Sequence, residues 1–288
     1  MSLSAQFANN ACPISFELFP PKTEAGFSAL YENVEKLNQF GPAFFTCTYG
    51  AGGSTRDSTL DVVREVKRIT GKPVASHLTC VGSTIEQLRN YLQQAVGGGV
   101  DYIVALRGDP PKGQTSFEAV AGGLRYANEL VALIRAEFST LGIAVAGYPE
   151  VHQEAVSAEV DLENLKRKVD AGADCIITQL FYDNDDFFRF RDACHAAGIQ
   201  IPIVPGLLPI TNFDQAKRIA SMCKAKLPQL LVEKFNENDD PQWQVQVGVE
   251  HACRQTNDLL ERGVDGLHLY VLNKSQAAAE VLSSIDRK

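Results

Sequence analysis

The chain has 288 residues, of which 45% are hydrophobic and 22% charged, ordinary values for a soluble globular protein with a large core. Its formal net charge of −8 argues against nucleic acid or an anionic membrane as the main partner, so an anionic ligand would need local basic groups. The seven cysteines are scattered and never spaced C-x-x-C, which indicates neither zinc nor disulfides and fits a reducing cytoplasm. We find no secretory signal and no apolar stretch long enough for a membrane span, and expect a soluble cytoplasmic protein.

Short apolar runs alternate with helical patterns along nearly the whole chain. We predict eight strands, at Ile14–Phe19, Ala43–Thr48, Pro73–Leu78, Tyr102–Leu106, Ile143–Gly147, Cys175–Gln179, Ile201–Val204 and Gly266–Tyr270. Between them, apolar residues at spacings of three and four predict helices over Gly26–Leu37, Thr59–Ile69, Ile85–Val96, Leu124–Phe138, Glu159–Val169 and Phe187–Ala197. Asn212 is a suitable N-cap for a further helix through Ile219.

Strand–helix alternation of this kind implies a parallel sheet, and eight repeats favour a single α/β domain over residues 1–288, folded as a closed (β/α)8 TIM barrel. An open doubly wound sheet is the alternative, because periodicity does not report closure. Pro20-Pro21, rather than a G-x-G-x-x-G motif, follows the first strand, which argues against a dinucleotide-binding Rossmann domain. Two regions depart from the repeat: Gly108–Gly123, and Leu227–Gln242, which we interpret as a lengthened connection before the final helix.

Glu17 lies in the middle of the first apolar strand, so we expect its neighbours in the fold to be largely apolar. Desolvation favours the protonated form of a carboxyl group, and a carboxylic acid that is still protonated near neutral pH can act as a general acid. The plainer alternative is a half-exposed residue that pairs with a lysine or arginine.

Polar residues gather where the other predicted strands end, which is where a barrel carries its functional groups. The residues at these strand ends include Thr48, Tyr49, Ala51, His77, Arg107, Gly108, Asp109, Tyr148, His152 and Gln179. Hydrogen-bonded core histidines are the alternative for His77 and His152, and no acidic or cysteine partners at a consistent spacing indicate a metal site. The set favours a broad ligand, with aromatic rings for stacking and Arg107 for phosphate.

The helix over Glu159–Val169 carries Asp161, Asn164 and Lys168 on one face, with Arg167 beside them. An acid, an amide and two cations on one face suit a ribityl or ribose chain that leads to a diphosphate. The same charges would also make an ordinary solvated helix face.

The chain resembles the methylenetetrahydrofolate reductases, in their short bacterial form without a regulatory domain. The resemblance depends on motifs that span nearly the whole chain in the family's order: Ser15–Pro21, Thr48–Ala51, Leu106–Asp109, Tyr148–His152, Ile177–Gln179, Pro205–Pro209 and Leu272–Lys274. It implies an FAD-dependent (β/α)8 barrel that reduces 5,10-methylenetetrahydrofolate to 5-methyltetrahydrofolate with NADH or NADPH, in a ping-pong cycle, and so supplies methyl groups for methionine synthesis. Family members commonly form homo-oligomers, as dimers or tetramers.

The resemblance also implies residue roles. Glu17 would be the general acid that protonates the departing folate nitrogen, and Asp109 would tune the flavin and bind the pterin, so both are candidate catalytic and substrate-binding residues. Gln179, Gln215 and Lys274 would contact substrate, although Lys274 stands where some relatives carry arginine, which loses a bidentate grip on a carboxylate. The FAD contacts would be Thr48, Tyr49, Ala51, His77, Arg107, Gly108, Asp109, Ala127, Tyr148, His152, Ala155, Asp161, Asn164, Arg167 and Lys168.

Two other functions stay open on the residues alone. A flavin-free barrel aldolase or isomerase would need a Schiff-base lysine or a phosphate loop late in the chain, and Pro205–Pro209 supplies no Gly-Ser run for the latter. A non-catalytic flavin or folate binder would predict that Glu17 is replaceable.

Overall fold

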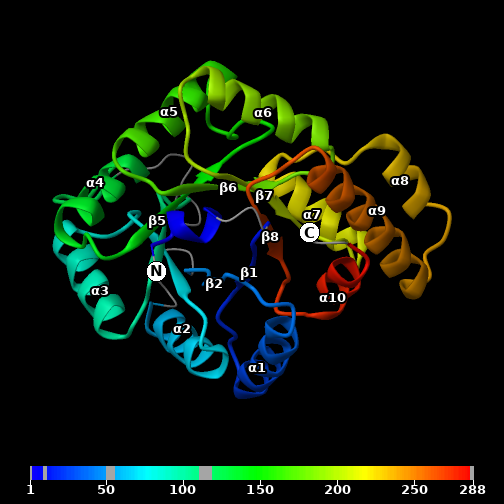
Figure 1. Cartoon of the computed structure of the whole chain (residues 1–288), viewed down its shortest axis with the longest axis horizontal. Helices are drawn as coiled ribbons and strands as arrows, with labels where there is room; N and C mark the ends of the chain where they lie inside the picture. The colour runs from blue at the N-terminus through cyan, green and yellow to red at the C-terminus, as the bar shows by residue number, and fades with distance from the viewer. Residues whose placement is uncertain (1, 9–11, 50–55, 110–118, 286–288) are drawn as a thin grey trace.

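The computed structural model describes residues 2–8, 12–49, 56–109 and 119–285. Within them, eight parallel strands close into a barrel in sequence order (Figure 1). The strands are β1 (Ile14–Leu18), β2 (Phe44–Cys47), β3 (Val74–Thr79), β4 (Tyr102–Leu106), β5 (Gly142–Gly147), β6 (Cys175–Leu180), β7 (Ile203–Leu207) and β8 (Leu267–Tyr270). The prediction of a closed (β/α)8 barrel is therefore confirmed, and the open-sheet alternative is wrong, because β1 pairs with both β2 and β8.

Helices surround the barrel in Figure 1. They are α1 (Glu24–Asn38), α2 (Arg56–Thr70), α3 (Ile85–Gly97), α4 (Ala127–Glu137), α5 (Ala158–Asp170), α6 (Asn184–Ala196), α7 (Phe213–Cys223), α8 (Gln229–Phe235), α9 (Pro241–Glu261) and α10 (Gln276–Ser283). Asn212 caps α7 as predicted, since its side chain accepts a hydrogen bond from the Gln215 N–H. Leu227–Gln242 is not simply a connection: it contains α8, whose Leu231 and Phe235 are buried.

Strand β7 departs most from its prediction. It continues to Leu207, beyond the expected end at Val204, although Pro205 and Gly206 are usually turn signals. Pro205 has no N–H to donate to β6, and the register shifts there: Val204 pairs with Ile177, but Gly206 pairs with Leu180. One extra residue is thus accommodated on β6, which is a β-bulge.

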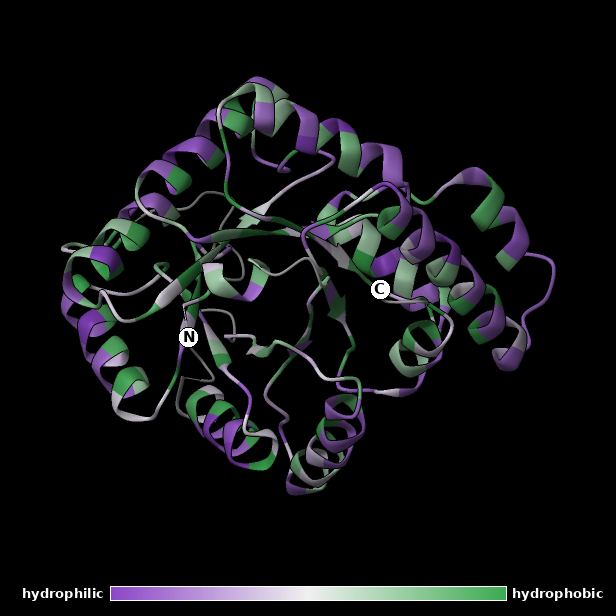
Figure 2. Ribbon diagram, in the orientation of Figure 1, coloured by the Kyte–Doolittle hydropathy of each residue, from purple (hydrophilic) through white to green (hydrophobic). Residues whose placement is uncertain are grey.

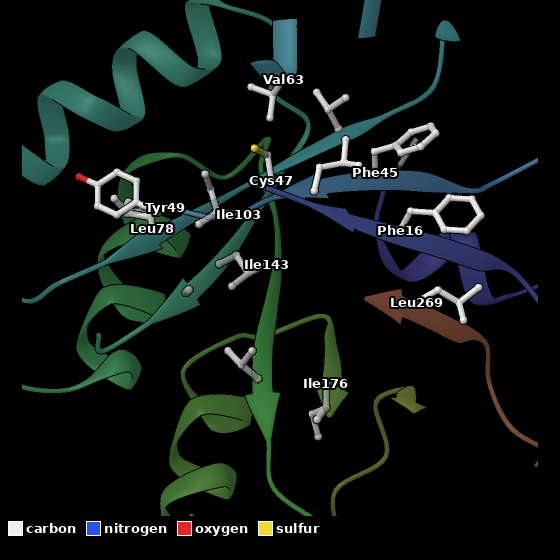
Figure 3. Packing of buried hydrophobic residues seen from close by; sticks show 14 of the residues in the cluster. Phe16, Phe45, Cys47, Tyr49, Val63, Leu78, Ile103, Ile143, Ile176 and Leu269 are labelled. Carbon is white, nitrogen blue, oxygen red and sulfur yellow. The ribbon is translucent and has the colours of Figure 1, made fainter. Parts of the chain in front are cut away.

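The main core lies between the barrel and its helices. Alternate strand residues point outward into it, and Figure 3 shows Phe16, Ile103, Ile143, Ile176 and Leu269 there. The helices contribute their apolar stripes and turn hydrophilic faces outward, as the colouring in Figure 2 shows. Burial on both faces explains why β4 and β5 are nearly continuous apolar runs.

The N-terminal end of the barrel is closed by a short 3₁₀ helix, η1 (Ser4–Phe7). Leu3, just before η1, is buried against the interior layer that contains Phe44 and Tyr102, and the Gln6 amide donates to the Tyr102 hydroxyl at 2.9 Å. This end is therefore a packed core, and access to the interior is from the opposite end. No helix in the described part of the chain is sufficiently long and apolar to span a bilayer.

Candidate active site

The interior side chains nearest the open end divide the barrel into two halves. On β8, β1, β2 and β3 they are polar: Ser15, Glu17, Thr46, His77, Thr79, His268 and Tyr270. On β4, β5 and β6 they are mostly apolar: Val104, Leu106, Ala146 and Ile177. We call these the polar half and the apolar half of the interior.

Both halves face a first cavity of about 390 Å³. It is lined by ten of the residues that the sequence singled out: Glu17, Thr48, Tyr49, His77, Arg107, Gly108, Asp109, Tyr148, His152 and Gln179. The clustering of strand ends that a barrel predicts is thus observed.

Glu17 lies in the polar half, not among apolar neighbours as expected. Successive side chains of a strand face opposite ways, so the flanking Phe16 and Leu18 pack outward against the helices. The expectation of an apolar surrounding is wrong for this reason. The Glu17 side chain is 20% exposed, which leaves it enclosed yet accessible from the cavity.

Two imidazoles face the Glu17 carboxyl group. Its Oε2 lies 3.4 Å from Nε2 of His77 and 3.7 Å from Nε2 of His268. Neither Nε2 has a hydrogen-bond partner among the described residues. Burial lowers the pKa of His77, and the Glu17 carboxylate opposes part of that shift. Small movements would therefore bring Glu17 into hydrogen-bond contact with either ring.

His268 and Ser15 are two residues near Glu17 that sequence reasoning missed. His268 is fully buried, and its Nδ1 lies 2.8 Å from Oγ of the equally buried Ser15, on the neighbouring strand. A signal was present: in the strand Leu267–Tyr270 the polar and apolar residues alternate, which puts His268 and Tyr270 on one face.

Gln179 reaches the cavity through the bulge on β6. There the Thr178 carbonyl accepts from the Tyr270 hydroxyl at 2.7 Å, and the Gly206 N–H donates to Oγ1 of Thr178 at 2.9 Å. A Cβ at Gly206 would overlap the Thr178 carbonyl oxygen and the Tyr270 ring, so only glycine allows this close approach. The bulge changes the direction of the Gln179 side chain, whose Oε1 accepts a hydrogen bond from the Leu180 N–H at 2.9 Å.

After β4 the chain turns sharply at Gly108, where φ is +90° and a Cβ would overlap the Val81 side chain. Asp109 is consequently exposed at the rim of the first cavity. The guanidinium of Arg107 makes two hydrogen bonds, of 2.6 and 2.8 Å, with the carboxylate of Glu154. That pairing raises the pKa of Arg107.

A second cavity, of about 450 Å³, adjoins the first, with which it shares Leu106, Arg107, Ala146, Tyr148 and His152. It is lined by the remaining predicted cofactor residues that the structure describes: Ala127, Ala155, Asp161, Asn164, Arg167 and Lys168. Glu154, Tyr126 and Asn128 also line it and were not predicted. Ala51 lies outside the described residues.

The predicted face of α5 turns toward this second cavity. Asp161 accepts from the His152 N–H at 3.0 Å, and Arg167 donates to the Asn164 side chain at 3.1 Å. Lys168 is not on a solvated face: its Nζ donates to the Ala146 carbonyl at 2.5 Å. Burial lowers the pKa of Lys168 to about 8, although Asp161 counteracts part of the shift.

Gln215 and Lys274 line a third cavity, of about 120 Å³, which shares Tyr270 with the first. Its other walls are mostly apolar, from Phe19, Leu208, Pro209, Leu272 and Ala277. The two predicted substrate contacts furthest along the chain thus lie in a cavity separate from that of Glu17, with Tyr270 in the lining of both. No group of three or more His, Cys, Asp or Glu side chains in the described ranges is arranged to hold a metal ion.

Comparison with known families and sequences identifies relatives of this chain. The family model described as "Methylenetetrahydrofolate reductase" matches residues 2–286. The chain is 40% identical over 273 residues to 5,10-methylenetetrahydrofolate reductase of Escherichia coli, covering 94% of this chain and 90% of that protein. It is 41% identical over 284 residues to methylenetetrahydrofolate reductase (NADH) 1 of Arabidopsis thaliana. The match covers 94% of this chain but only 48% of the plant protein, so the chain spans about half the length of the plant relative.

Solved structures with the same fold are more distant in sequence. A Clostridium thermocellum protein that binds two copies of 5-methyl-5,6,7,8-tetrahydrofolic acid superposes with a TM-score of 0.68, at 15% identity, over 98% of this chain and 96% of that one. Dihydropteroate synthase from Xanthomonas albilineans gives a TM-score of 0.53 at 14% identity, over 95% of this chain and 91% of that one. At these identities the likeness concerns the barrel alone.

Proposed function

The chain belongs to the methylenetetrahydrofolate reductase family, and on that premise we propose that it reduces 5,10-methylenetetrahydrofolate to 5-methyltetrahydrofolate, with NADH or NADPH as reductant and FAD as cofactor. The observation that carries the proposal is the position of Glu17. Its carboxyl group lies beside two imidazoles in a cavity that Gln179 and Asp109 also line. That is the arrangement a general acid needs in order to act on a bound heterocycle.

The proposed proton step opens the five-membered ring of the substrate. Glu17 gives its proton to the ring nitrogen that departs, and the electron pair of the breaking C–N bond goes to that nitrogen. The methylene carbon is left as an electrophilic iminium. Glu17 is then an anion 3.4 Å from His77 and 3.7 Å from His268, so either imidazole, once it has itself taken up a proton, can pass that proton to the carboxylate.

His268 is connected further through Ser15. The hydroxyl of Ser15 is 2.8 Å from Nδ1 of His268 and donates at 3.4 Å to the Leu267 carbonyl. A hydroxyl can either donate to or accept from Nδ1, so it supports both neutral tautomers of the ring. We infer that this pair lets His268 present either a lone pair or an N–H to Glu17.

The second cavity fits the diphosphate and ribityl parts of FAD. Lys168 lies buried in its wall, where desolvation lowers its pKa to about 8 although Asp161 opposes the shift, so an anionic ligand would stabilise the charged ammonium group there. Arg107 and Arg167 bring further positive charge, and Asn164 offers an amide. The flavin ring would then lie in the first cavity, against the apolar half. When bound, FAD would supply the hydride that completes the methyl group, after receiving one from the nicotinamide.

The remaining predicted residues fall on a path for the folate. Asp109 and Gln179 would bind the pterin at the rim of the first cavity, and Gln215 and Lys274 would hold the tail in the third. Lys274 would meet a carboxylate of that tail as a point charge. NAD(P)H and folate would occupy the first cavity in turn, which gives ping-pong kinetics.

Two measurements on the purified protein test this function. Flavin absorption bands, present on isolation or after addition of FAD, should be bleached by NADH or NADPH under anaerobic conditions and restored by methylenetetrahydrofolate. Absence of bands in both preparations contradicts the cofactor. Bands that the nicotinamide bleaches but the folate does not restore contradict the substrate, and bands that neither reagent changes would leave a non-catalytic flavin binder.

A further inference from the structure

The loop between β8 and α10 holds an unusual backbone conformation. Leu272 and Asn273 are consecutive, neither is glycine, and their φ angles are +47° and +57°. Such residues cost free energy and persist only where the surrounding structure fixes them. The loop lies directly after Tyr270, which lines both the first cavity and the third. A strained backbone at this point raises the question of what fixes it.

The side chain of Asn273 binds the main chain of Phe19 at both of its polar groups. Its Nδ2 donates to the Phe19 carbonyl at 2.8 Å, and its Oδ1 accepts from the Phe19 N–H at 3.0 Å. Regular pairing of β1 with β8 ends at Glu17 and Tyr270. The Asn273 amide therefore links the chain segments that follow β1 and β8, beyond the point where their backbone hydrogen bonding ends.

Phe19, held in this way, forms part of the wall of the third cavity. Phe19 is 39% exposed, unlike the buried Phe16 of the preceding strand β1. Gln215 and Lys274 lie in the same wall, with Leu208 and Leu272 as apolar neighbours. An accessible ring beside an amide and a cation suits a flat aromatic group that carries a carboxylate.

We propose that Asn273 is a positioning residue for the substrate: it fixes Phe19 so that this ring supports the aminobenzoyl ring of the folate tail while Lys274 meets the carboxylate. The inference rests on the proposed function and adds a residue to it. Asn273 touches no reacting atom. It acts through the main chain of Phe19, and its own left-handed conformation directs the next residue, Lys274, toward the cavity.

The chain offers a matched control on the same loop. Asn33 of α1 accepts two hydrogen bonds from Ser275, from its N–H at 3.0 Å and from its hydroxyl at 2.7 Å. Asn33 thus also holds the loop through two hydrogen bonds, but it does not reach Phe19 or the third cavity. A purely structural role of the loop should make both asparagines equally important.

The variants are Asn273→Gly, Asn33→Ala, Phe19→Ala and the double variant Asn273→Gly with Phe19→Ala. Glycine is chosen at position 273 because it keeps the left-handed conformation available while it removes the amide. We expect Asn273→Gly to raise the KM for methylenetetrahydrofolate about tenfold, as the loss of two neutral hydrogen bonds predicts, with kcat nearly unchanged. Asn33→Ala should leave that KM unchanged, and reduction of the bound flavin by NADH should be unchanged in both.

The double variant tests whether Asn273 acts through Phe19. If it does, Asn273→Gly should add little to the KM of Phe19→Ala, because the ring it positions is gone. Additive effects would overturn the inference, as would equal increases in KM for Asn273→Gly and Asn33→Ala. If the unaltered protein reduces no folate at all, the proposed function has failed rather than the role of Asn273.

Discussion

The polar half of the barrel interior and the second cavity both collect polar side chains, but they differ in how those side chains are paired. Around Glu17, four buried polar atoms have no hydrogen-bond partner in the described ranges: Thr46 Oγ1, His77 Nε2, Thr79 Oγ1 and His268 Nε2. Around Lys168, the charged groups are already engaged, by Glu154, Asn164 and the Ala146 carbonyl.

The difference in hydrogen-bond pairing between the two regions has a physical explanation. Leaving a buried polar group without a partner costs about 1–3 kcal/mol, so a cluster of such groups is retained where a ligand or a moving proton will satisfy them. A groove whose charges are already paired keeps its shape without a ligand, and the ligand must displace those pairs. We therefore expect substitutions around Glu17 to lower the rate of chemistry and substitutions around Lys168 to lower affinity.

The most severe test of this division is Glu17→Gln, which keeps the shape of the side chain but removes the proton. Loss of a general acid should lower the rate of folate reduction about thousandfold. Reduction of the flavin by NADH needs no proton from Glu17, so its rate should stay within about twofold. Stopped-flow measurement of the two half-reactions through the flavin absorbance separates them.

Glu17→Asp is the companion variant, because it keeps an acid but withdraws it by one methylene group. Its folate half-reaction should be slowed less than that of Glu17→Gln. If both variants slow the two half-reactions equally, Glu17 binds the flavin or stabilises the fold instead of supplying the proton. The expected difference between the polar half and the second cavity would then be wrong.

The second prediction concerns Lys168→Met. A charge-assisted hydrogen bond to a phosphate is worth about 2 kcal/mol, so the Kd for FAD should rise about thirtyfold, while kcat at saturating FAD is preserved. Lys166→Met is the matched control, since Lys166 lies on the same helix but pairs with Asp170 at the surface. Quenching of flavin fluorescence reports both dissociation constants.

The pKa of Lys168 adds a pH dependence with a definite sign. The ligand-free site holds the protonated amine below about pH 8 and loses it above. FAD affinity should therefore be constant below pH 8 and fall above it, approaching tenfold per pH unit. In Lys168→Met this decline should be absent; a decline that persists in the variant would assign the titration to another group.

How far the sequence predicts these two regions depends on the range of the interactions. The barrel and its helices follow from local periodicity, and so does the α5 face, because Asp161, Asn164 and Lys168 are related by helical spacing. The direction in which the Gln179 side chain points was not predictable, because the bulge that sets it arises from Pro205 on the neighbouring strand. Nor was the pairing of His268 with Ser15, 253 residues apart, which only closure of the barrel brings together. Short α8 was missed because seven residues give too little periodicity.

Ser15→Ala tests that unpredicted contact and should have a smaller effect. It removes one neutral hydrogen bond, worth about 1 kcal/mol, so the folate half-reaction should slow about fivefold. Flavin reduction by NADH should not change, because the lost contact acts on the folate step through His268. An unchanged folate half-reaction would make Ser15 a packing residue only.

Glu154→Gln should have the smallest effect, and it should strengthen FAD binding rather than weaken a function. Glu154 holds Arg107 with two hydrogen bonds at the mouth of the second cavity, where an incoming phosphate needs the same guanidinium. The Glu154 side chain is 41% exposed, and a pair so accessible to solvent is worth at most about 1 kcal/mol. Removing the charge should therefore tighten FAD binding by about threefold, measured by the same fluorescence titration.

The comparison variant is Glu163→Gln, whose carboxylate lies 3.8 Å from Arg167 with both side chains well exposed, so it should change the Kd for FAD less. Weaker FAD binding by Glu154→Gln would reverse the interpretation. Glu154 would then orient Arg107 for the phosphate instead of competing with it. The second cavity would in that case be pre-organised by its ion pair, and its ligand would add to the pairs already present rather than displace them.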